Sequence, residues 1–106
     1  MVTSHDEHDT HIFGLVSRNG EILSGKGFKV DKKHQGIYFI AFDQPFAESP
    51  GVTCTIYGDS WRSFQMSVAV LEINPNFFVC QTSTPTLPED SGFSFIAVGP
   101  SHGAPE

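Results

Sequence analysis

Residues 36–58 read GIYFIAFDQPFAESPGVTCTIYG, and this stretch decides the fold. Two apolar runs, Ile37–Phe42 and Val52–Tyr57, flank a proline-containing segment that neither a helix nor a strand can continue. The second run alternates apolar residues with threonines, which is typical of a strand with one buried face. In the first run both alternating sets are apolar, which predicts that both faces of the strand are covered. Because one sandwich supplies only one covering sheet, the second cover must be a loop or another subunit.

Turn residues separate six further runs of strand character, and no helical period is longer than one turn. The spacing predicts an all-β fold, a compact antiparallel β-sandwich of about seven or eight short strands, over residues 12–99. Residues 1–11 are predicted to form a flexible His-rich arm, and residues 100–106 a C-terminal tail. The predicted strands are Ile12–Val16, Glu21–Leu23, Phe28–Val30, Ile37–Phe42, Val52–Tyr57, Met66–Ile73, Phe77–Thr82 and Phe93–Val98.

Composition narrows the classes of partner. The chain of 106 residues is one domain, and its 12 acidic and 6 basic residues give a net charge of −6. This charge opposes the attraction to phosphates that drives nucleic-acid binding, so no nucleic-acid partner is expected. No apolar run approaches the roughly 18 residues that span a bilayer, and the N-terminus lacks the features of a signal peptide. We expect no membrane insertion, and synthesis in the cytoplasm with a virion or extracellular destination left open.

The two cysteines, Cys54 and Cys80, lie within predicted strands and leave two interpretations open. They are either two free thiols in the core, where cysteine behaves as a small hydrophobic residue, or one disulfide. The free thiols are favoured, because a single bridge is far from the disulfide density of a small secreted scaffold.

The N-terminal arm carries His5, His8 and His11, with carboxylates between them. Imidazoles at this spacing can bind a divalent transition metal such as Zn²⁺, Ni²⁺ or Cu²⁺, more tightly where several arms meet in an oligomer. Ordering a flexible arm costs entropy, so adventitious binding is the default interpretation. No other cofactor is expected.

The best local set for ligand binding is Tyr57, Asp59, Trp61 and Arg62. An aromatic platform, an acceptor and a planar donor would together stack on a sugar ring and hold its hydroxyl groups. The alternative is that Trp61 plugs one end of the sandwich or a subunit interface, where Trp and Arg are also enriched.

No residues in the sequence have the spacing of a recognised catalytic motif. The chain has no serine-nucleophile motif, no zinc-protease motif and no phosphate-binding glycine loop. Asp43 and Glu48 border the same proline corner, but acidic residues occur there for reasons of turn structure. The protein is therefore predicted not to be an enzyme.

Three motifs resemble a β-sandwich module found at the ends of phage tail-fibre, collagen-like and bacterial surface proteins. They are Gly25-x-Gly27-Phe28-x-Val30, Gly36-x-Tyr38-x-Ile40-x-Phe42-x-x-Pro45-Phe46-x-x-x-Pro50-x-Val52, and Phe93-x-Phe95-Ile96-Ala97-Val98-Gly99-Pro100. The part from Ile37 to Gly99 is also similar to an H-type lectin domain.

This resemblance implies a homotrimer that binds carbohydrate at its end or at a subunit boundary, as an adhesion module would. With the two-sided apolar strand, it predicts a subunit interface at Tyr38, Ile40, Phe42 and Phe95, or at the alternate residues of those strands. Two other functions are kept as alternatives. One is a purely structural trimerisation module of a phage tail or surface protein, and the other is a metal-binding oligomer.

Overall fold

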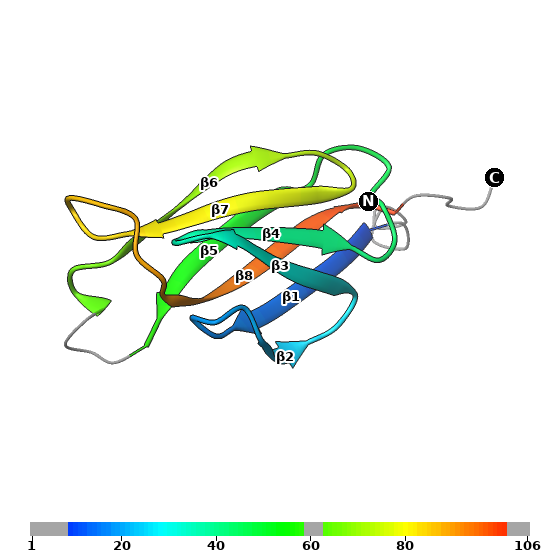
Figure 1. Cartoon of the computed structure of the whole chain (residues 1–106). Helices are drawn as coiled ribbons and strands as arrows, with labels where there is room; N and C mark the ends of the chain where they lie inside the picture. The colour runs from blue at the N-terminus through cyan, green and yellow to red at the C-terminus, as the bar shows by residue number, and fades with distance from the viewer. Residues whose placement is uncertain (1–8, 59–62, 102–106) are drawn as a thin grey trace.

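Eight strands form from the alternating runs, and Figure 1 shows them arranged in two layers. The computed structural model describes residues 9–58 and 63–101. Over these two ranges, no helix has the length and apolar character that crossing a membrane requires. The strands are β1 (Asp9–Val16), β2 (Ile22–Gly25), β3 (Phe28–His34), β4 (Ile37–Phe42), β5 (Gly51–Tyr57), β6 (Ser67–Ile73), β7 (Phe77–Ser83) and β8 (Gly92–Pro100).

The strands build two four-stranded sheets in which every neighbouring pair is antiparallel. Sheet A has the order β2-β1-β8-β5, and sheet B has the order β3-β4-β7-β6. Both long central pairs, β1 with β8 and β4 with β7, join segments far apart in sequence. The predicted all-β antiparallel sandwich is confirmed.

Strand β1 includes the last three residues of the predicted arm. Asp9, Thr10 and His11 pair with Pro100, Gly99 and Val98 of β8. A polar Asp-Thr-His sequence carries no apolar alternation, so only the pairing with β8 reveals it as strand.

A five-residue turn, Ser17 to Glu21, joins β1 to β2. The Gly20 amide donates to the Ser17 carbonyl at 2.9 Å, and the Ser17 amide donates to the Glu21 carbonyl at 2.8 Å. Gly20 has φ = 90°, which is the left-handed conformation that closes a turn of this length. The turn contains Asn19-Gly20, a dipeptide typical of tight hairpins, and it has one residue more than the tightest hairpin.

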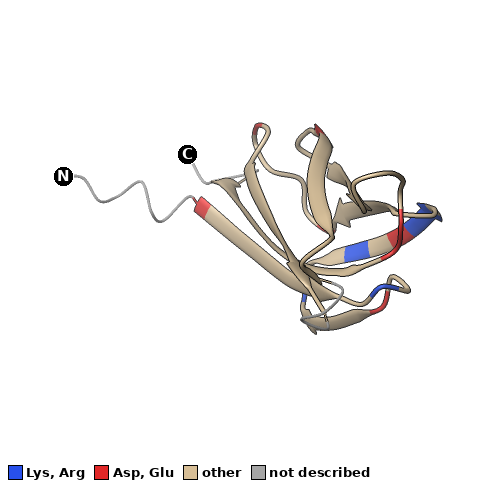
Figure 2. Ribbon diagram, turned by 90° about the vertical axis from the view of Figure 1, so that its left-hand side faces the viewer, with Lys and Arg blue, Asp and Glu red and all other residues tan. Residues whose placement is uncertain are grey.

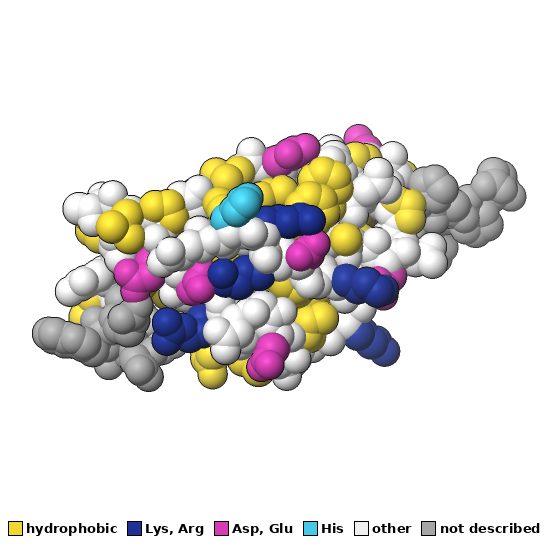
Figure 3. All heavy atoms as spheres, in the orientation of Figure 1, with side chains coloured by type: hydrophobic (Ala, Val, Ile, Leu, Met, Phe, Trp, Pro, Cys, Tyr) yellow, Lys and Arg dark blue, Asp and Glu magenta, His cyan; other side chains and the backbone are white. Residues whose placement is uncertain are grey.

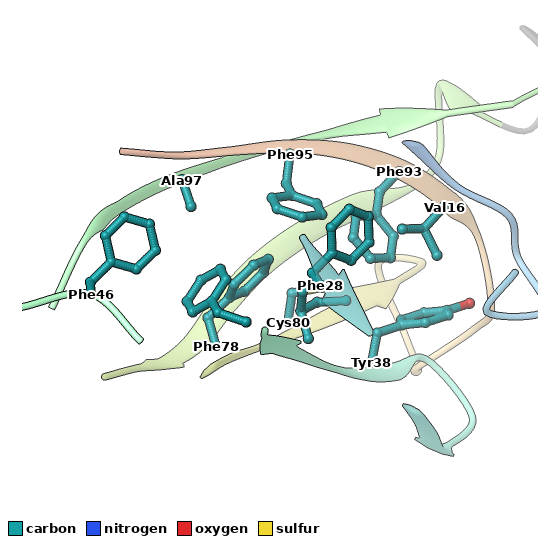
Figure 4. Close-up of a cluster of buried hydrophobic side chains, with 11 residues drawn as sticks. Val16, Phe28, Tyr38, Phe46, Phe78, Cys80, Phe93, Phe95 and Ala97 are labelled. Carbon is teal, nitrogen blue, oxygen red and sulfur yellow. The ribbon is translucent and has the colours of Figure 1, made fainter. Parts of the chain in front are cut away.

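The core lies between the sheets and consists mainly of aromatic rings (Figure 4). Phe95 of β8 packs edge-to-face on Phe28 and Phe78 of sheet B, with ring centroids 4.9 and 5.0 Å apart. Phe93 packs in the same manner on Tyr38, at 5.0 Å. These contacts join the sheets through rings that are almost wholly buried.

The subunit interface predicted at Tyr38, Ile40, Phe42 and Phe95 is wrong for these four residues. Their side chains point between the two sheets of one chain, and none is more than 8% exposed. A second copy has no access to them while the sandwich is folded. Any interface must use the alternate residues, which point outward.

Neighbouring residues of sheet B cover part of the outer side of β4. Phe39 stacks on Phe77 of β7 with ring centroids 4.3 Å apart, and Lys33 places its Nζ atom 5.5 Å from the Phe39 centroid. Ile37, Phe39 and Ala41 are consequently half-buried. Cross-strand neighbours and a lysine stem thus cover part of the apolar surface for which the sequence predicted a loop or a subunit.

Strand β6 changes its alternation at a bulge. Its register with β7 shifts between Val70 and Glu72, so Leu71 has no partner residue and is 55% exposed. Beyond the bulge, Ile73 returns to the inner side with Val68 and Val70. Strict alternation would instead have placed Ile73 on the side of Leu71.

Charges gather on β3 and on the loops, as Figure 2 shows. Basic and acidic side chains lie side by side on the face seen in Figure 3. Each of the three lysines of β3 pairs with an aspartate, so the strand presents no separate cationic patch. The pairs are Lys29 with Asp43 at 3.0 Å, Lys32 with Asp90 at 3.0 Å, and Lys33 with Asp31 at 2.8 Å.

The outer side of sheet A is almost free of charge. In β1, β5 and β8, all of whose residues are described, Asp9 is the single Asp, Glu, Lys or Arg residue, and the exposed His11 is the single histidine. We use the name apolar face for the outward residues Phe13, Leu15, Ile96 and Val98. Phe13 and Ile96 are directly opposite each other across β1 and β8 and are 59% and 55% exposed. The exposed side chains of this face are therefore available to contact another molecule.

Candidate functional site

A hollow of about 260 Å³ opens at one end of the sandwich, and we call it the end hollow. Strand β8 pairs with both β1 and β5, which brings Val16, Tyr57 and Gly92 together at this end. The β1–β2 turn, the end of β5, the start of β6 and the start of β8 all contribute. The lining residues are Ser17, Arg18, Leu23, Tyr57, Gly58, Ser63, Met66, Asp90, Ser91 and Gly92.

Tyr38 lies in the core beneath the end hollow and hydrogen-bonds to the backbone of Arg18. Its hydroxyl donates to the backbone carbonyl of Arg18 at 2.6 Å, although Tyr38 belongs to sheet B and Arg18 to a turn of sheet A. Burial, with a smaller contribution from the Asp90 carboxylate, raises the pKa of Tyr38 to about 12. The phenol therefore stays protonated and remains a donor over the physiological pH range.

Asp90 of the β7–β8 connection is fixed at the end hollow by two partners. Its Oδ1 atom accepts a hydrogen bond from the Gly36 amide at 2.7 Å and lies 3.0 Å from Lys32 Nζ. Gly36 has φ = 78°, and a Cβ atom there would lie 2.6 Å from the Thr82 carbonyl. Only glycine fits this turn, so the approach of β4 to Asp90 depends on it.

The connection before β8 is held against β7 by Thr82. The buried Thr82 hydroxyl donates to the Glu89 carbonyl at 2.6 Å, and the Glu89 amide donates back to the Thr82 carbonyl at 3.1 Å. Asp90 and Ser91 follow directly, so their positions at the hollow are set by this pair of hydrogen bonds. Asp90 and Ser91 are thus held in place by hydrogen bonds between β7 and the connection that precedes them.

Tyr57 supplies the exposed aromatic surface. It is the last residue of β5, it points outward, and it is 51% exposed. Arg18 offers up to five N–H donors and Asp90 offers carboxylate acceptors, while Ser17, Ser63 and Ser91 can both donate and accept. The hollow therefore combines an aromatic platform with donors and acceptors for several hydroxyl groups.

The predicted ligand set is placed only in part. Tyr57 lines the end hollow, whereas Asp59, Trp61 and Arg62 lie outside the described residues. Gly58 and Ser63, which bound that segment in the described chain, both line the hollow. The sequence prediction thus selected one residue that the structure places in a concave site.

Arg18 and Asp90 were missed because no local pattern connects them. They are 72 positions apart in the sequence and meet only because β8 pairs with β1. The Asn19-Gly20 turn signal placed Arg18 in a hairpin turn, but a turn residue has no special status until its neighbours in space are known.

A second hollow of about 260 Å³ lies at the other end of the sandwich. Of its charged and polar residues, Asp43 pairs with Lys29, and Thr10 and Ser101 hydrogen-bond to each other at 2.6 Å. Its lining has no exposed aromatic residue and no basic residue, so it offers fewer groups to a polar ligand. It is lined by Thr10, Ile12, Gly27, Asp43, Gln44, Phe46 and Ser101.

The predicted metal site is also placed only in part. His11 is exposed on β1 opposite Val98, whereas His5 and His8 lie outside the described residues. Over residues 9–58 and 63–101, no group of three or more His, Cys, Asp or Glu side chains is arranged to hold a metal ion.

Cys54 and Cys80 are free thiols on the inner sides of opposite sheets. The Cys80 thiol is wholly buried and hydrogen-bonds to Cys54. That hydrogen bond, together with burial, raises the pKa of Cys80, and it lowers the pKa of Cys54, which accepts it. The preference for free core thiols over a bridge agrees with this structure.

Comparison with protein-family models, curated proteins and solved structures gives no match to the chain. The class that the structure defines is an antiparallel two-sheet sandwich with a polar and aromatic hollow at one end.

Proposed function

We propose that the protein is a non-catalytic binding module that takes one saccharide residue in the end hollow. The observation that carries this proposal is the half-exposed ring of Tyr57 beside Arg18 and Asp90 in a hollow of about 260 Å³. The volume is below the roughly 300–1,000 Å³ of pockets that take drug-sized ligands, and it suits a single ring.

The chemistry of a sugar fits these groups. The apolar C–H side of a pyranose ring packs on an aromatic ring, and its hydroxyl groups need both donors and acceptors. Tyr57 would supply the platform, Arg18 the donors and Asp90 the acceptor. The Gly36 amide and Lys32 hold the Asp90 carboxylate in place, whereas Tyr38 holds only the backbone carbonyl of Arg18, so binding would have to order the exposed Arg18 side chain.

The proposal includes self-association, because one shallow hollow binds a single sugar weakly and several copies on one ligand surface add avidity. The apolar face is the surface that supports it: Phe13, Leu15, Ile96 and Val98 are uncharged and exposed or half-buried. A face without charge lets copies of a chain of net charge −6 approach with their charges directed away. Three copies is the number that the lectin and tail-fibre resemblance implies.

A purely structural assembly module is the second candidate function. The same apolar face favours it, because self-association needs no ligand. In that case the end hollow would have no saccharide-binding role.

A glycan array followed by titration calorimetry of the best-bound sugar tests the proposal. Tyr57→Ala and Arg18→Ala are each expected to weaken binding at least tenfold, which corresponds to about 1.4 kcal/mol. Tyr57→Phe keeps the ring and should stay within about threefold. Lys26→Ala, in the exposed β2–β3 connection, is the control and should bind as the wild type does.

Two results would contradict the saccharide proposal. One is an intact, folded protein that binds no glycan on the array. The other is binding that persists in both Tyr57→Ala and Arg18→Ala, which would place the ligand elsewhere. The first result with a stable oligomer would favour the structural module.

A further inference from the structure

We infer that Cys54 and Cys80 form an intramolecular disulfide that ties the two sheets together when the protein meets a small-molecule disulfide oxidant. The inference is independent of saccharide binding and rests on the placement of the two thiols in the fold.

The alternation of each strand directs both thiols into the same space. In β5, Cys54 lies on the inner side with Val52 and Ile56, and the threonines between them point outward. In β7, Cys80 lies on the inner side with Phe78 and Thr82. Because β5 belongs to sheet A and β7 to sheet B, the two thiols face each other across the core.

Contacts around the cysteines place them in adjacent layers of the core. Phe95 is the residue opposite Cys54 across β5 and β8, and its ring lies 5.0 Å from that of Phe78. Phe78 precedes Cys80 by two positions on the same side of β7. The hydrogen bond between the two thiols agrees with this placement. The disulfide requires the sulfurs to come to about 2.05 Å and the two Cα atoms to lie within roughly 7 Å of each other.

The two thiols differ in access, which sets the order of the reaction. Cys80 is wholly buried, whereas Cys54 is half-buried on β5, which pairs only with β8 and forms an edge of sheet A. An edge strand opens more readily than a central one, so a small reagent reaches Cys54 first. Cys80 is then the partner that completes the bond.

The exchange balances with a low-molecular-weight disulfide as the oxidant. The Cys54 thiolate attacks one sulfur of the reagent, forms a mixed disulfide and releases one small thiolate. The Cys80 sulfur, having lost its proton, attacks the Cys54 sulfur and releases the second small thiolate. The reagent is reduced to two thiols, and the two protein thiols are oxidised to one disulfide.

The bond would close a loop that contains the whole of β6 and joins two strands of different sheets. Closing a loop of about 25 residues in the unfolded chain raises Tm by roughly 10–20 °C in a domain of this size. The same loop includes Gly58, Ser63 and Met66 of the end hollow.

The test is incubation of the folded, full-length protein with oxidised glutathione, followed by intact-mass analysis and thiol counting. We expect two reactive thiols after denaturation to fall to none, a mass lower by about 2 Da, and a Tm higher by about 10 °C or more. Cys54→Val is the matched control, because its neighbours on the same side are Val52 and Ile56, and its Tm should not respond to the oxidant.

Three outcomes would overturn the inference. They are a wild-type protein that keeps both thiols, a stable glutathione adduct on Cys54, and a disulfide between two chains seen on a non-reducing gel. If Cys54→Val fails to fold, Cys54→Ser serves as the control, and peptide mapping of the oxidised wild type must still find Cys54 joined to Cys80.

Discussion

Tyr38 combines a structural and a positioning role in one side chain. Its ring belongs to the core, where it packs on Phe93, and its hydroxyl reaches the carbonyl of Arg18 in a turn of the other sheet. The Lys32 Nζ atom lies 5.9 Å from the centroid of the same ring and pairs with Asp90. Both charged residues of the end hollow, Arg18 and Asp90, are therefore connected to Tyr38. A change at this residue should therefore affect stability and the hollow together.

The raised pKa of Tyr38 predicts a loss of stability at alkaline pH. Below pH 10 the phenol is neutral in both the folded and unfolded chain, so its full contribution is present. Between pH 10 and about 12 the unfolded chain ionises first, and about 2–3 kcal/mol of unfolding free energy should be lost. Tyr38→Phe should cost about 1 kcal/mol at pH 8 and show a smaller loss over that window.

Urea unfolding at pH 8, 10, 11 and 12 measures this effect. Tyr57→Phe, which changes the half-exposed tyrosine, is the control and should keep the wild-type dependence on pH. If Tyr38→Phe loses as much stability as the wild type between pH 10 and 12, the assignment to Tyr38 is wrong.

Gly14 is required by core packing. A Cβ atom at Gly14 would clash with the Phe28 ring and would lie 2.6 Å from the Phe95 ring. Gly14→Ala is expected to lower the free energy of unfolding by about 1–3 kcal/mol through overpacking. In Gly51→Ala the nearest atom would be 3.9 Å away, so this matched strand variant should change stability by no more than about 0.5 kcal/mol. Equal effects in chemical denaturation would contradict the packing argument.

At the scale of the elements, β8 organises sheet A. Its inner residues Phe93, Phe95 and Ala97 are buried, whereas its outer residues Ile96 and Val98 are exposed. Both alternating sets are largely apolar, yet the sandwich covers only one of them. The outer set is what the structure offers for self-association.

Ile96→Lys tests this use of the apolar face. Ile96 has Phe13 and Thr53 as its cross-strand neighbours, so a charge there would lie at the centre of the face. The variant should show the mass of an 11.6 kDa monomer in light scattering at concentrations where the wild type associates. Leu71→Lys, at an equally exposed site on β6, should associate as the wild type does. A wild type that stays monomeric at high micromolar concentration would contradict self-association.

The sequence predicted strands better than it predicted which face of a strand is covered. Alternation in β5 correctly predicted Val52 and Cys54 to pack on the core and Ile56 to be half-buried on the same side, because only one of the two alternating sets in this strand is apolar. In β4 both sets are apolar, so periodicity left the choice open, and the inward set was assigned to an interface. The bulge at Leu71 was also invisible, since one unpaired residue leaves no mark in the sequence.

At the scale of the whole molecule, the end hollow shows why a site is harder to predict than a fold. Tyr57 could be chosen from its local neighbourhood, but Arg18 and Asp90 join it only through the β1–β8–β5 pairing. Strand pairing partners depend on the complete arrangement of both sheets. A single sequence contains the strands but not the order in which they lie side by side.

The pairing of Asp9 with Pro100 also fixes where the described chain enters and leaves the sandwich. Asp9 and Pro100 lie side by side at the end of the sandwich opposite the end hollow, where β1 begins and β8 ends in Figure 1. Neighbouring strands are about 5 Å apart, so a loop of a host protein could accept this domain with little loss of closure entropy. Such an insertion would present the hollow away from the host, at the tip of the fusion.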